Sequence, residues 1–328
     1  MRKKHYLLLF HKMDERADCE GGLPLIIYKG KKEEDKMSEA SERIRKSFKE
    51  SDDIRDAGLT TPDDIVRYDN ILYGTIPQWQ TLDVYRPKNA FGKKLPVIVS
   101  VHGGAWVYGD KERYQYYCMN LSQRGFAVVN FTYRLAPEYK FPASLEDTNL
   151  VFRWVLEHAE EYCFDTDNIF GVGDSAGAHI LSLYVAMCTN QDCALQYDFK
   201  PAEGFIPKGI GLNCGKYEMK LEDEDMELME EFLEKDKMQE EIAQINVVDY
   251  ITSEFPPVYL MTATEDFLKR QSLILAHVLT EKNVPFEFHF YGSMEKGLGH
   301  VFHINIKTEE AKQCNDEECH FFRKLMEK

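Results

Sequence analysis

The segment NIFGVGDSAG, residues 168–177, constrains the fold of this chain more than any other. Its first half is a short apolar run typical of a buried strand, and it ends at two glycines that bracket Ser175. An apolar helical pattern, SAGAHILSLYVAMC, follows directly. A strand that turns at once into a helix needs small residues two places before and after its central residue, because larger side chains would collide there. Gly173 and Gly177 hold those places, so the pattern favours a serine nucleophile over a plain glycine–serine bend.

Strand and helix patterns alternate along the chain from residue 80 onward. This alternation predicts an α/β fold with a parallel sheet and helices on both faces. The expected strands are residues 81–87, 95–101, 126–135, 167–173, 206–214, 256–264 and 284–291. The expected helices include 38–49, 113–125, 175–188 and 270–282, one that opens at Pro142, and a charged last helix that ends at Lys328.

One acidic segment, residues 221–241, interrupts the alternation. Its apolar residues are Met226, Met229, Phe232 and Leu233, which form a narrow stripe at helical spacing. The stripe fits a solvated surface helix with one packed face. A lid over the mouth of a substrate site is the alternative, because the segment falls between two late strands.

Charge and composition restrict the partners of the chain. Its net charge of −16 argues against binding to nucleic acid or to an anionic membrane surface, both of which need clustered Lys and Arg. The N-terminus MRKKHYLLLF imitates a signal peptide, but its apolar core spans only residues 6–10 and no small-residue cleavage site follows. We therefore expect a mature segment there, no membrane span and a cytoplasmic protein.

The 8 cysteines show no zinc-site spacing. Cys314 and Cys319 are a close pair, with His320 beside them, but five residues along one helix point two side chains to different faces. We expect free, mostly buried thiols and no metal.

A second glycine-rich strand end lies at His102-Gly103-Gly104-Ala105-Trp106. Because glycine has no side chain, the backbone N–H groups of Gly103 and Gly104 can approach a substrate closely. Together with the N–H of Ala176, those of Gly103 and Gly104 are expected to form an oxyanion hole. His102 comes too early in the chain to be the catalytic base, and it is expected to brace this loop by hydrogen bonds.

A nucleophilic serine needs a histidine base and a carboxylate that orients the histidine, in the order Ser, Asp or Glu, His. After Ser175, Asp266 follows one expected strand and His300 follows the next, where active sites of α/β folds gather. Glu265 and His303 are the reserve candidates. His289 lies within a strand and His277 within a helix, so neither is favoured.

These motifs together resemble the hormone-sensitive-lipase-like branch of the α/β-hydrolase superfamily, the bacterial acetyl-esterase and carboxylesterase group. The resemblance runs from about residue 80 to the C-terminus. It rests on HGGAW (102–106), YRLAPEYKFPASLED (133–147), GDSAG (173–177), TATEDFL (262–268) and Gly299-His300. It implies a single α/β-hydrolase domain over 1–328, with a mostly parallel central sheet of about eight strands. It also implies a helical cap from residues 1–78 and 215–250.

The resemblance further implies Ser175, Asp266 and His300 as a catalytic triad that cleaves short-chain carboxylic, acetyl-type esters. No cofactor is expected, and the partner is a small-molecule ester; a homo-oligomer stays open. Ala105 stands where the family often has a third glycine, which leaves less room for bulky tertiary-alcohol esters. An amidase, such as an arylformamidase, would use the same triad. A non-catalytic binding protein on this fold is disfavoured because all three triad residues are present.

Overall fold

The central sheet of the protein has eight strands in the order β1-β2-β4-β3-β5-β6-β7-β8. β2 pairs antiparallel with β1 and with β4, and every other neighbouring pair is parallel. The predicted α/β fold with a mostly parallel sheet is therefore confirmed. The strands are β1 (Ile65–Leu72), β2 (Thr81–Pro87), β3 (Leu95–Val101), β4 (Ala127–Phe131), β5 (Phe164–Asp174), β6 (Gly209–Asn213), β7 (Val258–Ala263) and β8 (Phe286–Tyr291).

The computed structural model describes residues 39–221 and 226–327. Residues 6–10, which the sequence assigns to a mature segment, lie outside this range, and so does Cys19. No helix within it is long and apolar enough to cross a membrane. The seven cysteines that it contains are all free, as expected. Its helices are α1 (Glu39–Asp56), α2 (Lys111–Ser122), α3 (Ala143–Glu157), α4 (Ala176–Thr189), α5 (Gln191–Ala194), α6 (Met226–Phe232), α7 (Met238–Ile245), α8 (Lys269–Glu281) and α9 (Glu309–Met326).

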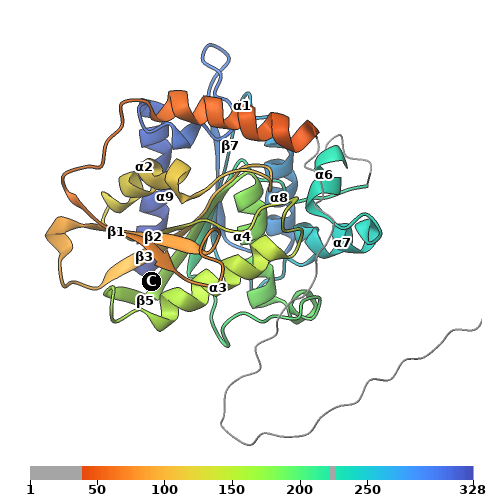
Figure 1. Cartoon of the computed structure of the whole chain (residues 1–328), viewed down its shortest axis with the longest axis horizontal. Coiled ribbons are helices and arrows are strands. Elements are labelled where there is room, and N and C mark those ends of the chain that lie inside the picture. Colours follow the sequence, from red (N-terminus) through yellow and green to blue (C-terminus); the bar gives the residue numbers. More distant parts are fainter. Residues whose placement is uncertain (1–38, 222–225, 328) are drawn as a thin grey trace, which may run out of the picture. The chain divides into compact units, whose positions relative to one another are not determined.

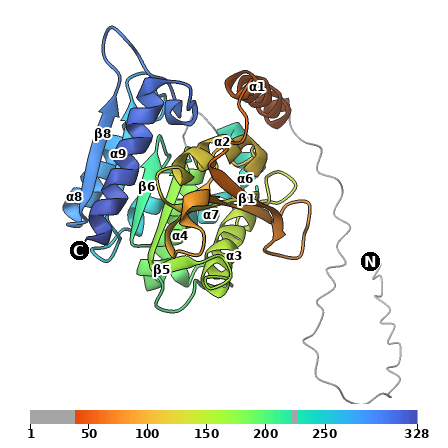
Figure 2. The same cartoon turned by 90° about the vertical axis from the view of Figure 1, so that its left-hand side faces the viewer.

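Helices cover both faces of the sheet (Figure 1, Figure 2). One core cluster packs α3, α4 and α8 against one face, and a second packs α2 and α9 against the other. β3 shows how one strand serves both, because successive side chains of a strand point to opposite faces. Val97, Val99 and Val101 belong to the first cluster, and Ile98 belongs to the second. Burial on both faces explains the unbroken apolar run in this strand.

Strand β1 was not predicted from the sequence, because the helix 38–49 was the one element expected between residues 38 and 78. The strand lies at the edge of the sheet, and its sequence IVRYDNIL mixes polar and apolar residues. Its register with β2 shifts between Tyr68 and Ile71, and Asn70 has a φ of 59°. An irregular, half-exposed edge strand lacks the strict alternation by which a strand is recognised in a sequence.

The acidic insertion forms α6 and α7. Met229, Phe232 and Leu233 are buried, which confirms the predicted packed face. The ring of Phe232 stacks on the indole of Trp106, with centroids 5.0 Å apart. The backbone N–H of Phe141 donates to the Phe232 carbonyl at 2.8 Å. This segment is therefore attached to the loop that follows β3.

A buried ion pair connects α3 to the loops beside it. The Asp147 carboxylate is fully buried and accepts bonds from the backbone and the guanidinium of Arg134 at 2.7–3.0 Å. It also accepts from Nε2 of Gln80 at 2.7 Å, and Oε1 of Gln80 in turn accepts from the backbone of Thr75 and Ile76. One carboxylate thus joins three chain segments.

We expect Asp147→Ala to lower the free energy of unfolding by about 3–5 kcal/mol, because it leaves the Arg134 charge without its buried partner. Urea unfolding measures the change. Glu160→Ala, which removes an exposed pair with Lys94, is the control and should leave stability unchanged. Equal stability of the two variants would contradict this role for Asp147.

Candidate active site

Ser175 occupies the strained turn that the sequence predicts. It lies between β5 and α4 with φ 52° and ψ −119°, a conformation that is costly for a residue with a side chain. A Cβ on Gly177 would come within 2.1 Å of the Val101 carbonyl oxygen, and one on Gly173 within 2.7 Å of the Gly177 carbonyl oxygen. The predicted reason for both glycines is therefore confirmed. The N–H of Ser175 donates to the Asn213 carbonyl at 2.9 Å, which fixes the turn against β6.

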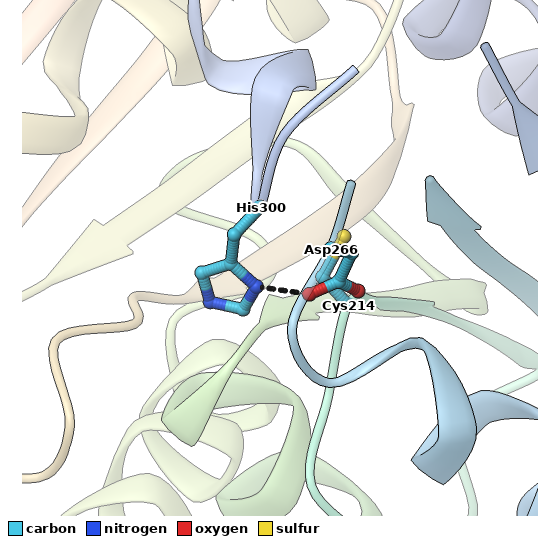
Figure 3. Close-up of side chains that lie close together, drawn as sticks. All are labelled: Cys214, Asp266 and His300. Carbon is cyan, nitrogen blue, oxygen red and sulfur yellow. Dashed lines mark hydrogen bonds and ion pairs between the residues drawn. The ribbon is translucent and has the colours of Figure 1, made fainter. Parts of the chain in front are cut away.

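Asp266 and His300 lie together, as the sequence predicts, although 34 residues separate them (Figure 3). Nδ1 of His300 is 2.7 Å from Oδ1 of Asp266. Burial alone would raise the pKa of Asp266, but the His300 bond and charge lower it, assisted by bonds from the Thr262 hydroxyl and the Leu268 backbone. Asp266 is thus held as a carboxylate that can orient a histidine.

Ser175 and His300 open into the same cavity, which has a volume of about 490 Å³. Side chains from α1 and α6, including Ile44, Phe48 and Leu228, form part of its wall. Trp106, Tyr108 and Tyr114 also line it. The remaining lining residues are Ser51, Asp52, Arg55, Gly103, Gly104, Ala105, Asp174, Ala176, Lys216, Phe267, Leu268, Val301 and Ile304.

The other histidines weighed from the sequence do not take the place of His300. His303 is fully buried behind it, and this burial lowers its pKa to about 3. His102 is also fully buried, its Nδ1 lies 2.7 Å from the Gly103 carbonyl, and it stacks on Tyr133. Burial lowers the pKa of His102 to about 4, so it stays neutral and braces the loop. His289 lies in β8 and His277 in α8.

The loop after β3 departs from the predicted oxyanion hole in one detail. The N–H of Gly103 donates to the Tyr114 hydroxyl at 2.9 Å, and that hydroxyl donates to Oδ2 of Asp174 at 2.7 Å. The N–H of Gly103 therefore already has an acceptor in the Tyr114 hydroxyl, whereas the prediction assigned this N–H to the oxyanion. Within the residues that the structure describes, the N–H groups of Gly104 and Ala105 donate no hydrogen bond.

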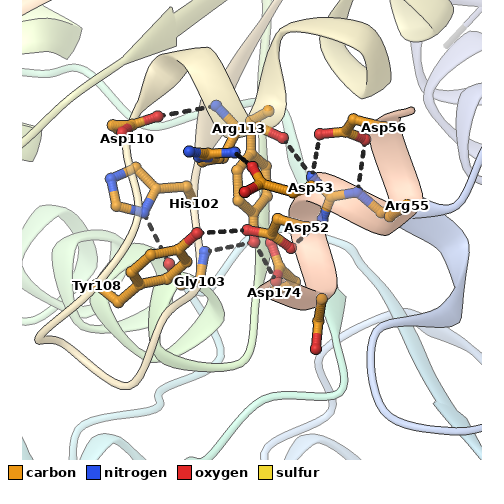
Figure 4. A network of polar contacts seen from close by, with 12 residues as sticks. Asp52, Asp53, Arg55, Asp56, His102, Gly103, Tyr108, Asp110, Arg113 and Asp174 are labelled. Carbon is orange, nitrogen blue, oxygen red and sulfur yellow. Dashed lines mark hydrogen bonds and ion pairs between the residues drawn. The ribbon is translucent and has the colours of Figure 1, made fainter. Parts of the chain in front are cut away.

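A polar network connects α1 to α2 and to the loop after β3 (Figure 4). Arg55 donates to Asp52 and to both carboxylate oxygens of Asp56, and it also donates to the backbone carbonyl of Arg113 at 2.7 Å. The Tyr108 hydroxyl donates to Asp52 at 2.9 Å. The Arg55 charge is thus balanced within the network, and sequence reasoning did not identify this helix as a source of site residues.

Two acidic groups lie beneath the nucleophile turn, and both were missed in the sequence. Burial raises the pKa of Asp174 to about 7, although the hydrogen bond from Tyr114 lowers it in part. Burial likewise raises the pKa of Glu318 to about 7, although hydrogen bonds from Asn213 and Tyr117 lower it in part. Asn213 donates to Glu318 at 2.9 Å across 105 positions of sequence. An acid in the middle of a charged helix such as α9 gives no signal that it will be buried.

The BD-FAE family model matches residues 82–279, which is more than half of the chain. The chain belongs to the BD-FAE family. The match covers the glycine-rich loop, the Ser175 turn and Asp266, and it stops before His300. The resemblance to α/β-hydrolase esterases that the sequence motifs indicated is therefore confirmed.

Several curated relatives and solved structures that the chain resembles are named esterases. The chain is 30% identical over 206 residues to Esterase LipQ of Mycobacterium tuberculosis, a match that covers 60% of this chain and 48% of LipQ. It is 26% identical to the versiconal hemiacetal acetate esterase of Dothistroma septosporum, over 70% of this chain and 73% of that protein. Esterase B of Lactobacillus rhamnosis superimposes with a TM-score of 0.80 and 26% identity, covering 88% of this chain and 96% of Esterase B. The chain thus spans about half the length of LipQ.

The raised pKa of Glu318 predicts a pH-dependent stability. An ordinary glutamate has a pKa of about 4.5, so between that pH and about 7 the folded chain holds a proton that the unfolded chain has lost. Stability therefore falls as the pH rises through this window. Glu318→Gln should remove up to about 1.4 kcal/mol of that fall for each unit of pKa shift.

Urea unfolding of wild type and Glu318→Gln at about pH 5 and about pH 7 measures this difference. Glu309→Gln, on the exposed first turn of the same helix, is the control. Its stability should fall with rising pH as that of wild type does. A parallel pH dependence in all three proteins would contradict burial of an ionisable Glu318.

Proposed function

We propose that this protein is a serine hydrolase that cleaves short-chain carboxylic esters through an acyl-enzyme. The observation that carries the proposal is the placement of Ser175 on a strained strand-to-helix turn, in one cavity with a histidine that Asp266 orients. That arrangement supplies a nucleophile, a base and an orienting carboxylate. The esterase relatives support the same reaction class.

The proposed reaction begins when Nε2 of His300 takes the proton of the Ser175 hydroxyl. Oγ then bonds to the ester carbonyl carbon, and the carbonyl π electrons move onto its oxygen. When this intermediate collapses, the C–O bond to the alcohol breaks and His300 returns its proton to the leaving oxygen. Water repeats the sequence on the acyl-enzyme and releases the carboxylic acid.

The oxyanion is proposed to bind the N–H groups of Gly104 and Ala176. Ala176 is the first residue of α4, so the free N–H groups and the positive dipole end of that helix face the developing charge. Gly103, expected as a third donor, is instead proposed to hold the loop in place through Tyr114. Ala105 becomes the third candidate donor, because its N–H is free of other acceptors in the described structure.

The cavity supports a small, largely neutral substrate. Its volume of about 490 Å³ lies in the range of sites for small organic ligands. Its walls are mainly apolar, and the charge of Arg55 is balanced by the carboxylates of Asp52 and Asp56. Among the relatives, one is named ethyl acetate hydrolase, from Pseudomonas putida, and Esterase B has been solved with a tributyrin phosphonate inhibitor. Both names refer to short acyl or alkyl groups.

We expect Ser175→Ala and His300→Ala each to abolish hydrolysis of p-nitrophenyl acetate and butyrate, because one removes the nucleophile and the other its base. His303→Ala, which removes a buried histidine outside the cavity lining, is the matched control and should keep activity if it folds. Activity in His300→Ala together with loss in a folded His303→Ala would show that the base is wrongly assigned. p-Nitroanilides of the same acids distinguish an esterase from an amidase.

Tyr114→Phe should lower kcat roughly tenfold to a hundredfold with little change in KM, because the loop that carries the oxyanion donors loses its anchor. The buried Asp174 would lose a hydrogen-bond donor in the same variant. Tyr116→Phe, on the same helix but outside the cavity lining, is the control. A rise in KM with unchanged kcat would contradict a role in oxyanion stabilisation.

A further inference from the structure

A thiol lies directly beside the Asp266–His300 pair (Figure 3). Cys214 follows the last residue of β6, is fully buried, and has a φ of 51°. One ligand atom each from Cys214, Asp266 and His300 lies within 4.8 Å of the others. Among the residues that the structure describes, no other group of three or more His, Cys, Asp or Glu side chains is arranged in this way.

Sulfur, carboxylate oxygen and imidazole nitrogen form a ligand set that Zn²⁺ takes in proteins. Zinc-to-ligand bonds of about 2.0–2.3 Å in a tetrahedron place ligand atoms roughly 3.3–3.8 Å apart. To enclose a cation, Sγ of Cys214 must therefore approach the other two atoms by up to about 1 Å. Nδ1 of His300 and Oδ1 of Asp266, which are 2.7 Å apart, must separate by about 0.6 Å. Three protein ligands and one open position also match the sites in which Zn²⁺ keeps a water molecule.

The surroundings tell which ligand moves. Asp266 is fixed by the Thr262 hydroxyl at 2.6 Å and the Leu268 N–H at 2.9 Å. His300 ends an exposed loop, and a Cβ on the preceding Gly299 would meet no atom within 4 Å. A bridge between Gly299 and Glu265 holds the backbone just before His300, so the imidazole side chain is the part that moves. His300 lines the cavity and Cys214 and Asp266 do not, so a cation from the cavity reaches them only when the imidazole turns aside.

We propose that Cys214, Asp266 and His300 form an inhibitory binding site for a thiophilic divalent cation such as Zn²⁺. The cation bonds to Sγ, to a carboxylate oxygen and to Nδ1, and a water molecule from the cavity fills the fourth position. The Sγ–H and Nδ1–H protons are released to solvent. Because the bond between His300 and Asp266 is replaced, His300 no longer has the orientation that a base for Ser175 needs; this consequence rests on the proposed function.

The chemistry of the group selects against hard cations. Mg²⁺ and Ca²⁺ prefer six or more oxygen ligands, whereas this group offers one carboxylate. The thiol must lose its proton to bind a metal, so only a cation that forms a strong bond to sulfur is held here. Soft and borderline cations give that bond, and Mg²⁺ does not.

Direct binding is tested with Co²⁺ on the full chain in the Ser175→Ala background, which makes the readout independent of catalysis. A tetrahedral cobalt–thiolate bond gives intense visible absorption and a sulfur-to-cobalt charge-transfer band. We expect both bands in Ser175→Ala and their loss when Cys214→Ser is added. Cys193→Ser, a fully buried thiol in α5, is the matched control and should keep them. Bands that persist without Cys214 would overturn the site.

Inhibition is tested with Zn²⁺ during hydrolysis of p-nitrophenyl butyrate. The Zn²⁺ concentration for half inhibition should rise at least about tenfold in Cys214→Ser, as loss of a metal partner commonly does. Cys193→Ser should respond as wild type does, and Mg²⁺ should have no effect. An unchanged response in Cys214→Ser would overturn the proposal. A chain that hydrolyses no ester but shows the Cys214-dependent cobalt bands would overturn the proposed function and keep the site.

Discussion

The close contact between the start of α4 and the end of β3 sets the geometry of the whole site. Gly177 packs directly against the carbonyl oxygens of Val101 and His102, which any side chain at that position would prevent. This contact lets the chain reverse within one residue, and Ser175 takes the strained conformation that results. The same contact brings the first N–H groups of α4 beside the loop at Gly103 and Gly104. The proposed nucleophile and the proposed oxyanion donors are thus positioned by one packing constraint.

A buried polar layer supports this turn from below. The Tyr114 hydroxyl joins the loop after β3 to Asp174, the residue before the nucleophile. Glu318 of α9 bonds to Asn213, whose carbonyl accepts the N–H of Ser175. These groups bond to one another, so the layer holds the strained turn by hydrogen bonds as well as by packing. Two acids with raised pKa values are the cost of that arrangement.

The helices above the sheet decide what reaches the turn. α1 contributes apolar side chains to the cavity, and its Arg55 is neutralised by Asp52 and Asp56. α6 contributes Leu228 and is attached through Phe232 to Trp106 on the loop after β3. A cavity with mainly apolar walls favours neutral ligands, because desolvating a charged ligand there is costly.

The sequence by itself determined the local elements and the residue types at the strand ends. Short patterns were enough to pick out Ser175 with its glycines, Asp266 and His300 as the proposed site residues. The steric demand of a tight turn is a local property, and the order of triad residues along the chain can be read directly from the sequence. The edge strand β1, the capture of the Gly103 N–H by Tyr114, the burial of Glu318 and the position of Cys214 beside Asp266 were decided only by the tertiary structure. Each of these depends on contacts between segments far apart in the chain, as between Asn213 and Glu318, and no local pattern records which distant side chain a folded sheet brings into reach.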